Sequence, residues 1–171
     1  SKFEIKSDKA HQELQRICTA NIKKEIGKCT YTHMLNTDGG IETDLTVVCI
    51  NKNHFRIISS ASTRERDKFH IRKHLTDDVD LIDVTDDYCV FGLFGPKSRE
   101  LMKTLSNDNF DNKEFKFGTA KYIQVNGINI WAQRLSYVGE LGYELYVKFN
   151  QSKKIYELLI EKGRNFNLSN C

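Results

Sequence analysis

The stretch "NTDGGIETDLTV", residues 36–47, shows how the first half of the chain folds. Its glycine pair favours a tight turn, because glycine adopts positive φ without steric cost. Beyond the turn, Leu45 and Val47 alternate with Thr46, which is the period-2 pattern of a strand that buries one face. Asp44 stands at the junction, where its carboxylate either caps the turn or serves a site on the sheet, and spacing alone leaves both readings open.

Working outward from this strand, the first half predicts the order β-α-β-β-β-α. A short strand over "KFEI" leads into a helix that is capped by Ser7 or Asp8 and has apolar residues at helical spacing. Strands over "YTHML", "DLTVVCI" and "FRIIS" follow, with "NKNH" as a hairpin turn. The charged segment "STRERDKFHIRKHL" predicts a helix that packs through Phe69 and Leu75.

The second half repeats this order. "YCVFGLFG" predicts a buried strand, and Pro96 stands at the expected first position of a helix over "PKSRELMKTL". A hairpin turns at Asn126-Gly127, the pair that type I′ turns favour. "YELYVKF" predicts the next strand, and the closing helix is expected to end near Gly163.

The repeated order is a weak internal duplication, and it predicts an α+β fold of two subdomains, residues 1–82 and 83–171. Each subdomain is expected to be an antiparallel sheet with packed helices, since hairpins impose antiparallel pairing and parallel neighbours need long crossovers. Residues 80–87 would join them. Because ligand sites tend to lie between such units, loops of both halves are expected to face one cleft.

Composition narrows the class of protein. The chain is 39% hydrophobic and 29% charged with a net charge of +3, which is too mild to indicate nucleic acid or an anionic membrane as a partner. We find neither a long apolar run nor a targeting segment, so we expect a soluble, cytoplasmic chain. Five scattered cysteines without a CxxC motif suggest neither zinc nor disulfides, and His70 and His74 lack a third metal ligand nearby.

A second loop with functional side chains is "RLSYVGELGYELYV", residues 134–147. Glu144 begins a strand although glutamate has poor strand propensity, so a compensating partner is expected. In one reading this is a surface hairpin in which Glu140 and Glu144 are solvated. In the other, a buried Glu144 accepts paired N–H donors from a planar heterocycle, as carboxylates do from flat bidentate donors.

Three motifs in this order, "YTHMLNTDGGIETDLTV", "VFGLFGPKSRELM" and "LSYVGELGYELYV", resemble the folate-binding aminomethyltransferase superfamily of the glycine cleavage T-protein. The similarity is greatest to the tetrahydrofolate domain of dimethylglycine and sarcosine dehydrogenases, and it runs along the whole chain. The resemblance implies the T-protein folate-binding fold, with a ferredoxin-like second subdomain. It also implies truncation, because family members continue into further strands and a barrel-like domain.

The resemblance further implies that tetrahydrofolate lies in a channel between the subdomains. Asp44 matches the family's catalytic aspartate, and Thr46 lies beside the folate. Tyr137 packs on the pterin or bonds to it, and Glu144 accepts hydrogen bonds from its amino-pyrimidine edge. The implied folate-binding set is completed by Glu140 and Tyr146.

Two function classes follow from the resemblance. The leading one is an enzyme domain that transfers a one-carbon unit from an N-methyl or aminomethyl donor to tetrahydrofolate, with FAD only in a separate flavin domain or subunit. The alternative is a non-catalytic module that binds folate or a partner protein. An RNA-modification or iron–sulfur maintenance factor ranks last, because "SYVGELGYE" lacks the Lys-Gly-Cys-Tyr-type motif expected of that branch.

Overall fold

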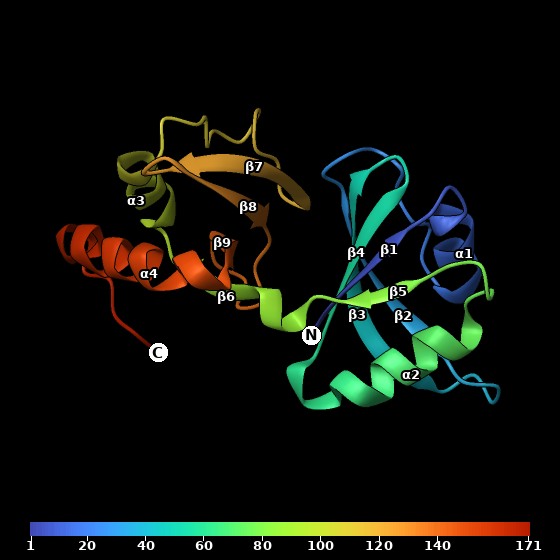
Figure 1. Ribbon diagram of the computed structural model, residues 1–171. Helices are drawn as coiled ribbons and strands as arrows, with labels where there is room; N and C mark the ends of the chain where they lie inside the picture. Colours follow the sequence, from blue (N-terminus) through green and yellow to red (C-terminus); the bar gives the residue numbers. More distant parts are fainter. The chain divides into compact units, whose positions relative to one another are not determined.

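The computed structural model describes residues 1–171, which form two compact units, Ser1–Thr85 and Asp86–Cys171. The division falls after Thr85, whereas the sequence placed it after residue 82. Each unit is an antiparallel sheet with helices (Figure 1), so the α+β fold predicted from the hairpins is confirmed.

The first unit contains a sheet of five strands in the order β2-β3-β4-β1-β5. Its elements are β1 (Lys2–Lys6), α1 (Ala10–Ile17), β2 (Cys29–Leu35), β3 (Ile41–Asn51), β4 (His54–Ser59), α2 (Arg64–His74) and β5 (Leu81–Asp83), with short 3₁₀ turns at Ala61–Thr63 and Thr85–Asp87. Strands β2, β3 and β4 form a meander, and β1 pairs antiparallel with β4 beside it. The short strand β5 was not predicted, and it extends the sheet beyond β1.

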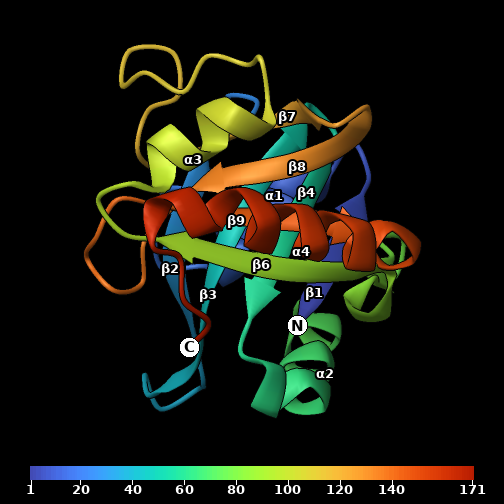
Figure 2. The same ribbon diagram turned by 90° about the vertical axis from the view of Figure 1, so that its left-hand side faces the viewer.

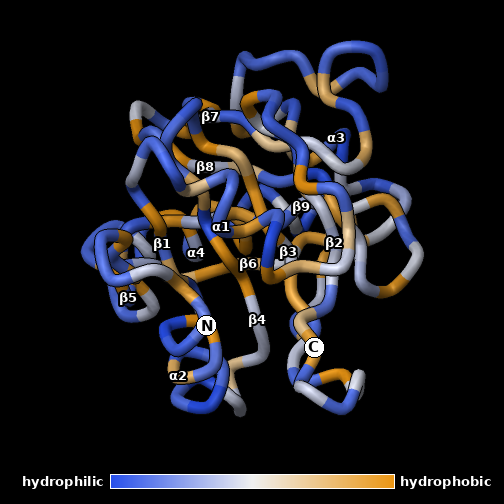
Figure 3. The backbone as a smooth tube through the Cα atoms, turned by 90° about the vertical axis from the view of Figure 1, so that its right-hand side faces the viewer, coloured by the Kyte–Doolittle hydropathy of each residue, from blue (hydrophilic) through white to orange (hydrophobic).

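Helices α1 and α2 pack on one face of this sheet. Leu45 and Val47 of β3 point into that core together with Leu14 of α1 and Ile71 of α2. The expected contact through Phe69 is wrong, since Phe69 is 70% exposed and Ile71 is fully buried in its place. The remainder of α2 is hydrophilic, as the tube in Figure 3 shows. The intervening residues of β3 point to the opposite, helix-free face.

The second unit repeats this plan with the strand order β6-β9-β8-β7. Its elements are β6 (Tyr88–Phe94), α3 (Ser98–Leu105), β7 (Thr119–Val125), β8 (Ile128–Arg134), β9 (Gly142–Lys148) and α4 (Phe149–Gly163), with a 3₁₀ turn at Arg164–Phe166. The first strand again lies beside the last strand of a three-stranded meander, so both units share one topology. The order is β-α-β-β-β-α, and the ferredoxin-like label, which denotes β-α-β-β-α-β, does not describe it.

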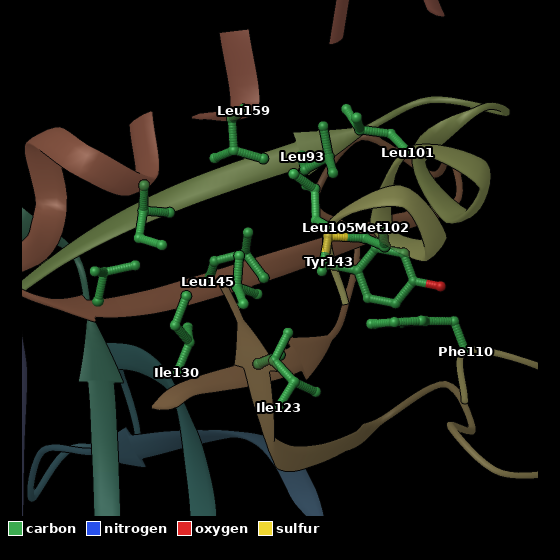
Figure 4. Close-up of a cluster of buried hydrophobic side chains, with 14 of the residues drawn as sticks. Leu93, Leu101, Met102, Leu105, Phe110, Ile123, Ile130, Tyr143, Leu145 and Leu159 are labelled. Carbon is green, nitrogen blue, oxygen red and sulfur yellow. The ribbon is translucent and has the colours of Figure 1, made fainter. Parts of the chain in front are cut away.

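The core of the second unit lies between its sheet and its two helices. Figure 2 shows α4 in front of the sheet, running alongside β6. Figure 4 shows Met102 of α3 and Leu159 of α4 packed toward Tyr143 and Leu145 of β9. The ring of Tyr143 meets that of Phe110 edge to face, with centroids 5.7 Å apart. None of the helices in the chain has the length and apolar character needed to cross a membrane.

Two turn predictions in this unit have different outcomes. Asn126 and Gly127 both have positive φ, 48° and 75°, as the predicted type I′ turn requires. Pro96 does not occupy the first helical position, because α3 begins at Ser98 and Lys97 is its N-cap residue. Gly95, with φ of 126°, turns the chain before the proline, so the helix starts two residues later than expected.

A buried ion pair stabilises the helix-free face of the first sheet. Arg56 of β4 is 2% exposed and donates from Nε and Nη2 to Oε1 of Glu4 on β1, at 3.1 and 2.7 Å. The second oxygen of Glu4 lies 2.9 Å from His54 and 3.0 Å from Lys6. Burial alone would raise the pKa of Glu4, but hydrogen bonds from His54, Arg56 and Lys6 outweigh it and hold the pKa well below its usual range.

We expect Glu4→Gln to lower the free energy of unfolding by roughly 3 kcal/mol, because it removes the charge of the carboxylate that pairs with the buried Arg56 guanidinium. Urea denaturation followed by circular dichroism measures this change. The matched control is Asp78→Asn, which removes a carboxylate that pairs with Lys9 on the exposed surface. Since exposed pairs contribute little, this control should unfold close to the wild type.

The same variant gives a pH prediction. A carboxylate with a depressed folded pKa contributes its full stabilisation above its ordinary pKa of about 4.3, and loses it as pH falls below that value toward the folded pKa. The difference in unfolding free energy between wild type and Glu4→Gln should therefore narrow as pH is lowered from about 7 to about 3. A difference that stays constant over this range would contradict the assigned role of Glu4.

Candidate functional site

Asp44 lies on the helix-free face of β3, because it alternates with the buried Leu45. Its side chain is exposed and faces His33, the residue directly opposite on β2. Oδ2 of Asp44 accepts a hydrogen bond of 3.1 Å from the Tyr31 hydroxyl. Oδ1 makes no hydrogen bond within the chain, so half of this carboxylate is open to a ligand.

The adjacent turn is capped by Asn36 and leaves no capping role for Asp44. Oδ1 of Asn36 accepts from the backbone N–H groups of Asp38 and Gly40 at 3.0 and 2.8 Å, and Gly39 takes the positive φ of 81° that closes the turn. The reading of Asp44 as a turn cap is therefore excluded by this geometry.

An extra residue in β3 determines which residues of β2 face Asp44. Leu35 pairs with Ile41 but Met34 pairs with Thr43, so Glu42 forms a β-bulge. The carbonyl of Glu42 accepts a hydrogen bond of 2.7 Å from Nη2 of Arg66 on α2. The bulge thus has its backbone acceptor satisfied by a helix that packs on the sheet.

Thr46 shares the face of Asp44 and is half-buried. It lies directly opposite Tyr31 on β2 and opposite Ile58 on β4. We refer to the four side chains Tyr31, His33, Asp44 and Thr46 as the aspartate patch. Sequence reasoning placed Asp44 and Thr46 in a site but missed Tyr31, although Tyr31 belongs to the same quoted motif.

Glu144 lies on β9, half-buried, between Gly92 of β6 and Gln133 of β8. Its Oε2 accepts a hydrogen bond of 2.8 Å from the hydroxyl of Tyr146, which is itself only 2% exposed. Oε1 of Glu144 makes no hydrogen bond within the chain. The buried tyrosine therefore holds one oxygen of the carboxylate and leaves the other available as an acceptor.

The space beside Glu144 is shaped by the ring of Phe94 and by two glycines. A Cβ built on Gly142 would lie 2.1 Å from Cδ1 of Phe94, and one built on Gly92 would lie 2.6 Å from its Cε2. Both distances are far shorter than any real contact, so the aromatic ring occupies the volume that side chains at these positions would need. Glu144 is consequently flanked by two residues that have no side chain.

Tyr137 and Glu140 lie in the loop 135–141 that precedes β9, and both are exposed. Tyr137 is 95% exposed and its hydroxyl makes no hydrogen bond within the chain. The structure thus joins Glu144 and Tyr146 by a hydrogen bond, but neither of them is hydrogen-bonded to Tyr137 or Glu140. Asp44 and Thr46 belong to the first unit, and the other four predicted residues belong to the second.

Asp44 and Glu144 share a chemical character that suits them to ligand binding and proton transfer. Each is a carboxylate with one oxygen held by a tyrosine hydroxyl and the other without an internal partner. Such a group accepts N–H donors, and when it lies beside a reacting nitrogen it can take a proton.

Comparison with known proteins gives consistent matches. The aminomethyltransferase of Halothermothrix orenii is 31% identical over 160 residues, which cover 93% of this chain and 44% of that protein. The mitochondrial dimethylglycine dehydrogenase of Rattus norvegicus is 30% identical over 172 residues, covering 99% of this chain and 20% of that protein. The chain therefore spans less than half the length of these relatives.

Solved structures support the same fold. The glycine cleavage system aminomethyltransferase T from Bartonella henselae superposes with a TM-score of 0.79 at 19% identity, covering 93% of this chain and 42% of that one. The sequence profile described as the GCVT N-terminal domain matches residues 1–171. Because this match covers the whole sequence, the chain belongs to the GCVT N-terminal domain family.

Proposed function

We propose that the chain binds tetrahydrofolate and transfers to it a one-carbon unit from an N-methyl or aminomethyl donor. The observation that carries this proposal is Asp44, an exposed carboxylate on a helix-free sheet face with one oxygen held by Tyr31 and one oxygen open. The names of the relatives, aminomethyltransferase and dimethylglycine dehydrogenase, both refer to carbon carried on an amine nitrogen.

The residues present fit a reduced folate. The pterin edge offers neighbouring N–H donors, and Glu144 offers a half-buried carboxylate whose Oε1 has no internal partner. The exposed ring of Tyr137 is available to stack on a flat heterocycle. Thr46, Glu140 and Tyr146 complete the proposed set, with Tyr146 acting through Glu144, because its buried hydroxyl donates to that carboxylate.

In this proposal Asp44 carries the chemistry. A nitrogen of tetrahydrofolate would attack the electrophilic carbon of an iminium ion or formaldehyde. The amine of the iminium ion, or water in the case of formaldehyde, would then leave as the second folate nitrogen bonds to the same carbon. As the first C–N bond forms, the attacking nitrogen must lose a proton, and the Asp44 carboxylate can take it while its negative charge stabilises the cationic carbon. Glu144 has a different role, since it fixes the orientation of the ring before the reaction.

The proposal implies a partner that supplies the carbon unit. An N-methyl amine must lose two electrons before its carbon becomes electrophilic, and the chain's proposed site contains acids and tyrosines with no redox group of its own. We propose that FAD in a separate flavin domain or subunit accepts these electrons, and that the amine is the second small-molecule ligand.

We expect Asp44→Asn to lower the rate of methylene-tetrahydrofolate formation by about 10²- to 10⁴-fold, the usual range for loss of a general base. The dissociation constant for tetrahydrofolate should change by no more than a few-fold, because Asp44 acts mainly on the transition state. Isothermal titration gives the affinity. The rate is measured above the uncatalysed rate, with a separate flavin enzyme that oxidises dimethylglycine as the carbon source.

Asp38→Asn is the matched control for this experiment, because Asp38 is an exposed acid in the same turn. It should bind and transfer like the wild type. Tight folate binding without any transfer by the wild type would indicate the non-catalytic folate module instead. Absence of saturable tetrahydrofolate binding would rule out the folate assignment for this chain.

Glu144→Gln should weaken tetrahydrofolate binding by roughly 1 to 3 kcal/mol, because it replaces a charged acceptor of two N–H donors with an amide that matches only one of them. The rate of the bound complex should change less than the affinity does. Glu114→Gln, an exposed acid of the same unit, serves as the control and should bind normally. Wild-type affinity in Glu144→Gln would refute the anchoring role.

A further inference from the structure

We infer that Tyr31 is a positioning residue for Asp44, and that its hydroxyl fixes the orientation in which the carboxylate takes a proton. The inference rests on the proposed function, in which Asp44 accepts the proton that the folate nitrogen loses. It adds a residue of the first unit to the machinery and gives that residue a role distinct from contact with the ligand.

The contact itself is specific. The Tyr31 hydroxyl donates to Oδ2 of Asp44 at 3.1 Å, across two neighbouring strands. Tyr31 is not directly opposite Asp44, since its partner on β3 is Thr46, so the bond runs diagonally between the strands. Aromatic side chains are long enough to reach such diagonal neighbours. The bond leaves Oδ1 as the only oxygen of Asp44 without a partner in the chain.

Neighbouring groups limit the motion of the Tyr31 ring. The ring of His33, two residues further along β2, meets that of Tyr31 in a T-shaped arrangement, with centroids 5.2 Å apart and planes at 78°. This is the edge-to-face arrangement that aromatic rings favour. His33 is also the residue directly opposite Asp44, so the ring that borders Tyr31 borders the carboxylate as well.

The β-bulge at Glu42 determines that this contact exists. If β2 and β3 paired without the extra residue, Tyr31 would lie opposite Leu45 and would point into the core. With the bulge, Tyr31 lies on the same face as Asp44. Bulges commonly redirect side chains in this way beside functional sites. Arg66 holds the bulge by donating to the Glu42 carbonyl.

The hydrogen bond has its greatest effect when a ligand covers it. Tyr31 is 62% exposed, so in the free chain water competes for both the hydroxyl and the carboxylate, and the net contribution of the bond to stability is small. A ligand that covers the aspartate patch excludes this water, and hydrogen bonds strengthen as the local dielectric falls. Tyr31 would therefore influence the reaction more than the fold.

The first test uses Tyr31→Phe, which removes only the hydroxyl. We expect the midpoint of urea denaturation and the tetrahydrofolate affinity to stay near wild type, while the transfer rate falls about tenfold, as for loss of one hydrogen bond to a charged group. In the Asp44→Asn background the same change should have no further effect, because the two residues act as one unit. Additive losses in the double variant would overturn the inference.

A second readout does not depend on activity. The ¹³C chemical shift of the Asp44 carboxyl carbon, measured by NMR on the free chain at neutral pH, should change in Tyr31→Phe. It should not change in Tyr122→Phe, an exposed tyrosine of the second unit that serves as the control. An unchanged Asp44 signal in Tyr31→Phe would show that the hydroxyl does not hold the carboxylate and would overturn the inference.

The two readouts separate this inference from the proposed function. If Asp44→Asn transfers carbon at the wild-type rate, the proposed function is wrong. The catalytic role inferred for Tyr31 is then wrong too, even if the NMR signal of Asp44 changes in Tyr31→Phe. If Asp44→Asn loses transfer but Tyr31→Phe keeps the full rate, the proposed function stands and the positioning role of Tyr31 is wrong.

Discussion

The helix-free face of the first sheet depends on one extra residue, Glu42, in β3. Side chains alternate strictly along a strand, so a single insertion exchanges the two faces of everything paired beyond it. Here the exchange places polar Tyr31 and His33 beside Asp44, and keeps Met34 and Leu45 in the core. The cost of the irregular backbone is reduced because α2 supplies a donor for the displaced carbonyl. The β-bulge at Glu42 thus determines both which residues enter the core and which form the aspartate patch.

Both units use a common arrangement to present an acid. In each, two helices cover one face of an antiparallel sheet, an acidic side chain near the start of a strand points to the other face, and a tyrosine hydroxyl holds one of its oxygens. The tyrosines differ in origin. Tyr31 reaches Asp44 from the neighbouring strand, whereas Tyr146 reaches Glu144 from two residues along the same strand. The two units therefore share a topology but place their acids in different surroundings, since Asp44 is exposed and Glu144 is half-buried.

Much of the fold could be predicted from the sequence because its determinants are local. Alternation in β3, the Asn-Gly turn and the repeated element order each depend on neighbouring residues, and the structure agrees with all three. The side-chain partner of Asp44 depends on register, which the bulge shifts by one residue, so the bond from Tyr31 could not be inferred from spacing. The exposed Phe69 was misjudged although helical period favours Ile71, which lies four residues before the buried Leu75 and so shares its face.

The ring of Phe94 has a consequence for how this sequence can change. It fills the volume above both Gly92 and Gly142, so even a methyl group at either glycine would collide with it. A side chain at either glycine therefore requires the ring of Phe94 to move or to be replaced. Gly92 and Phe94 of β6 are thus linked by packing to the distant Gly142, and relatives that carry a side chain at either glycine position should also carry a smaller residue in place of the phenylalanine.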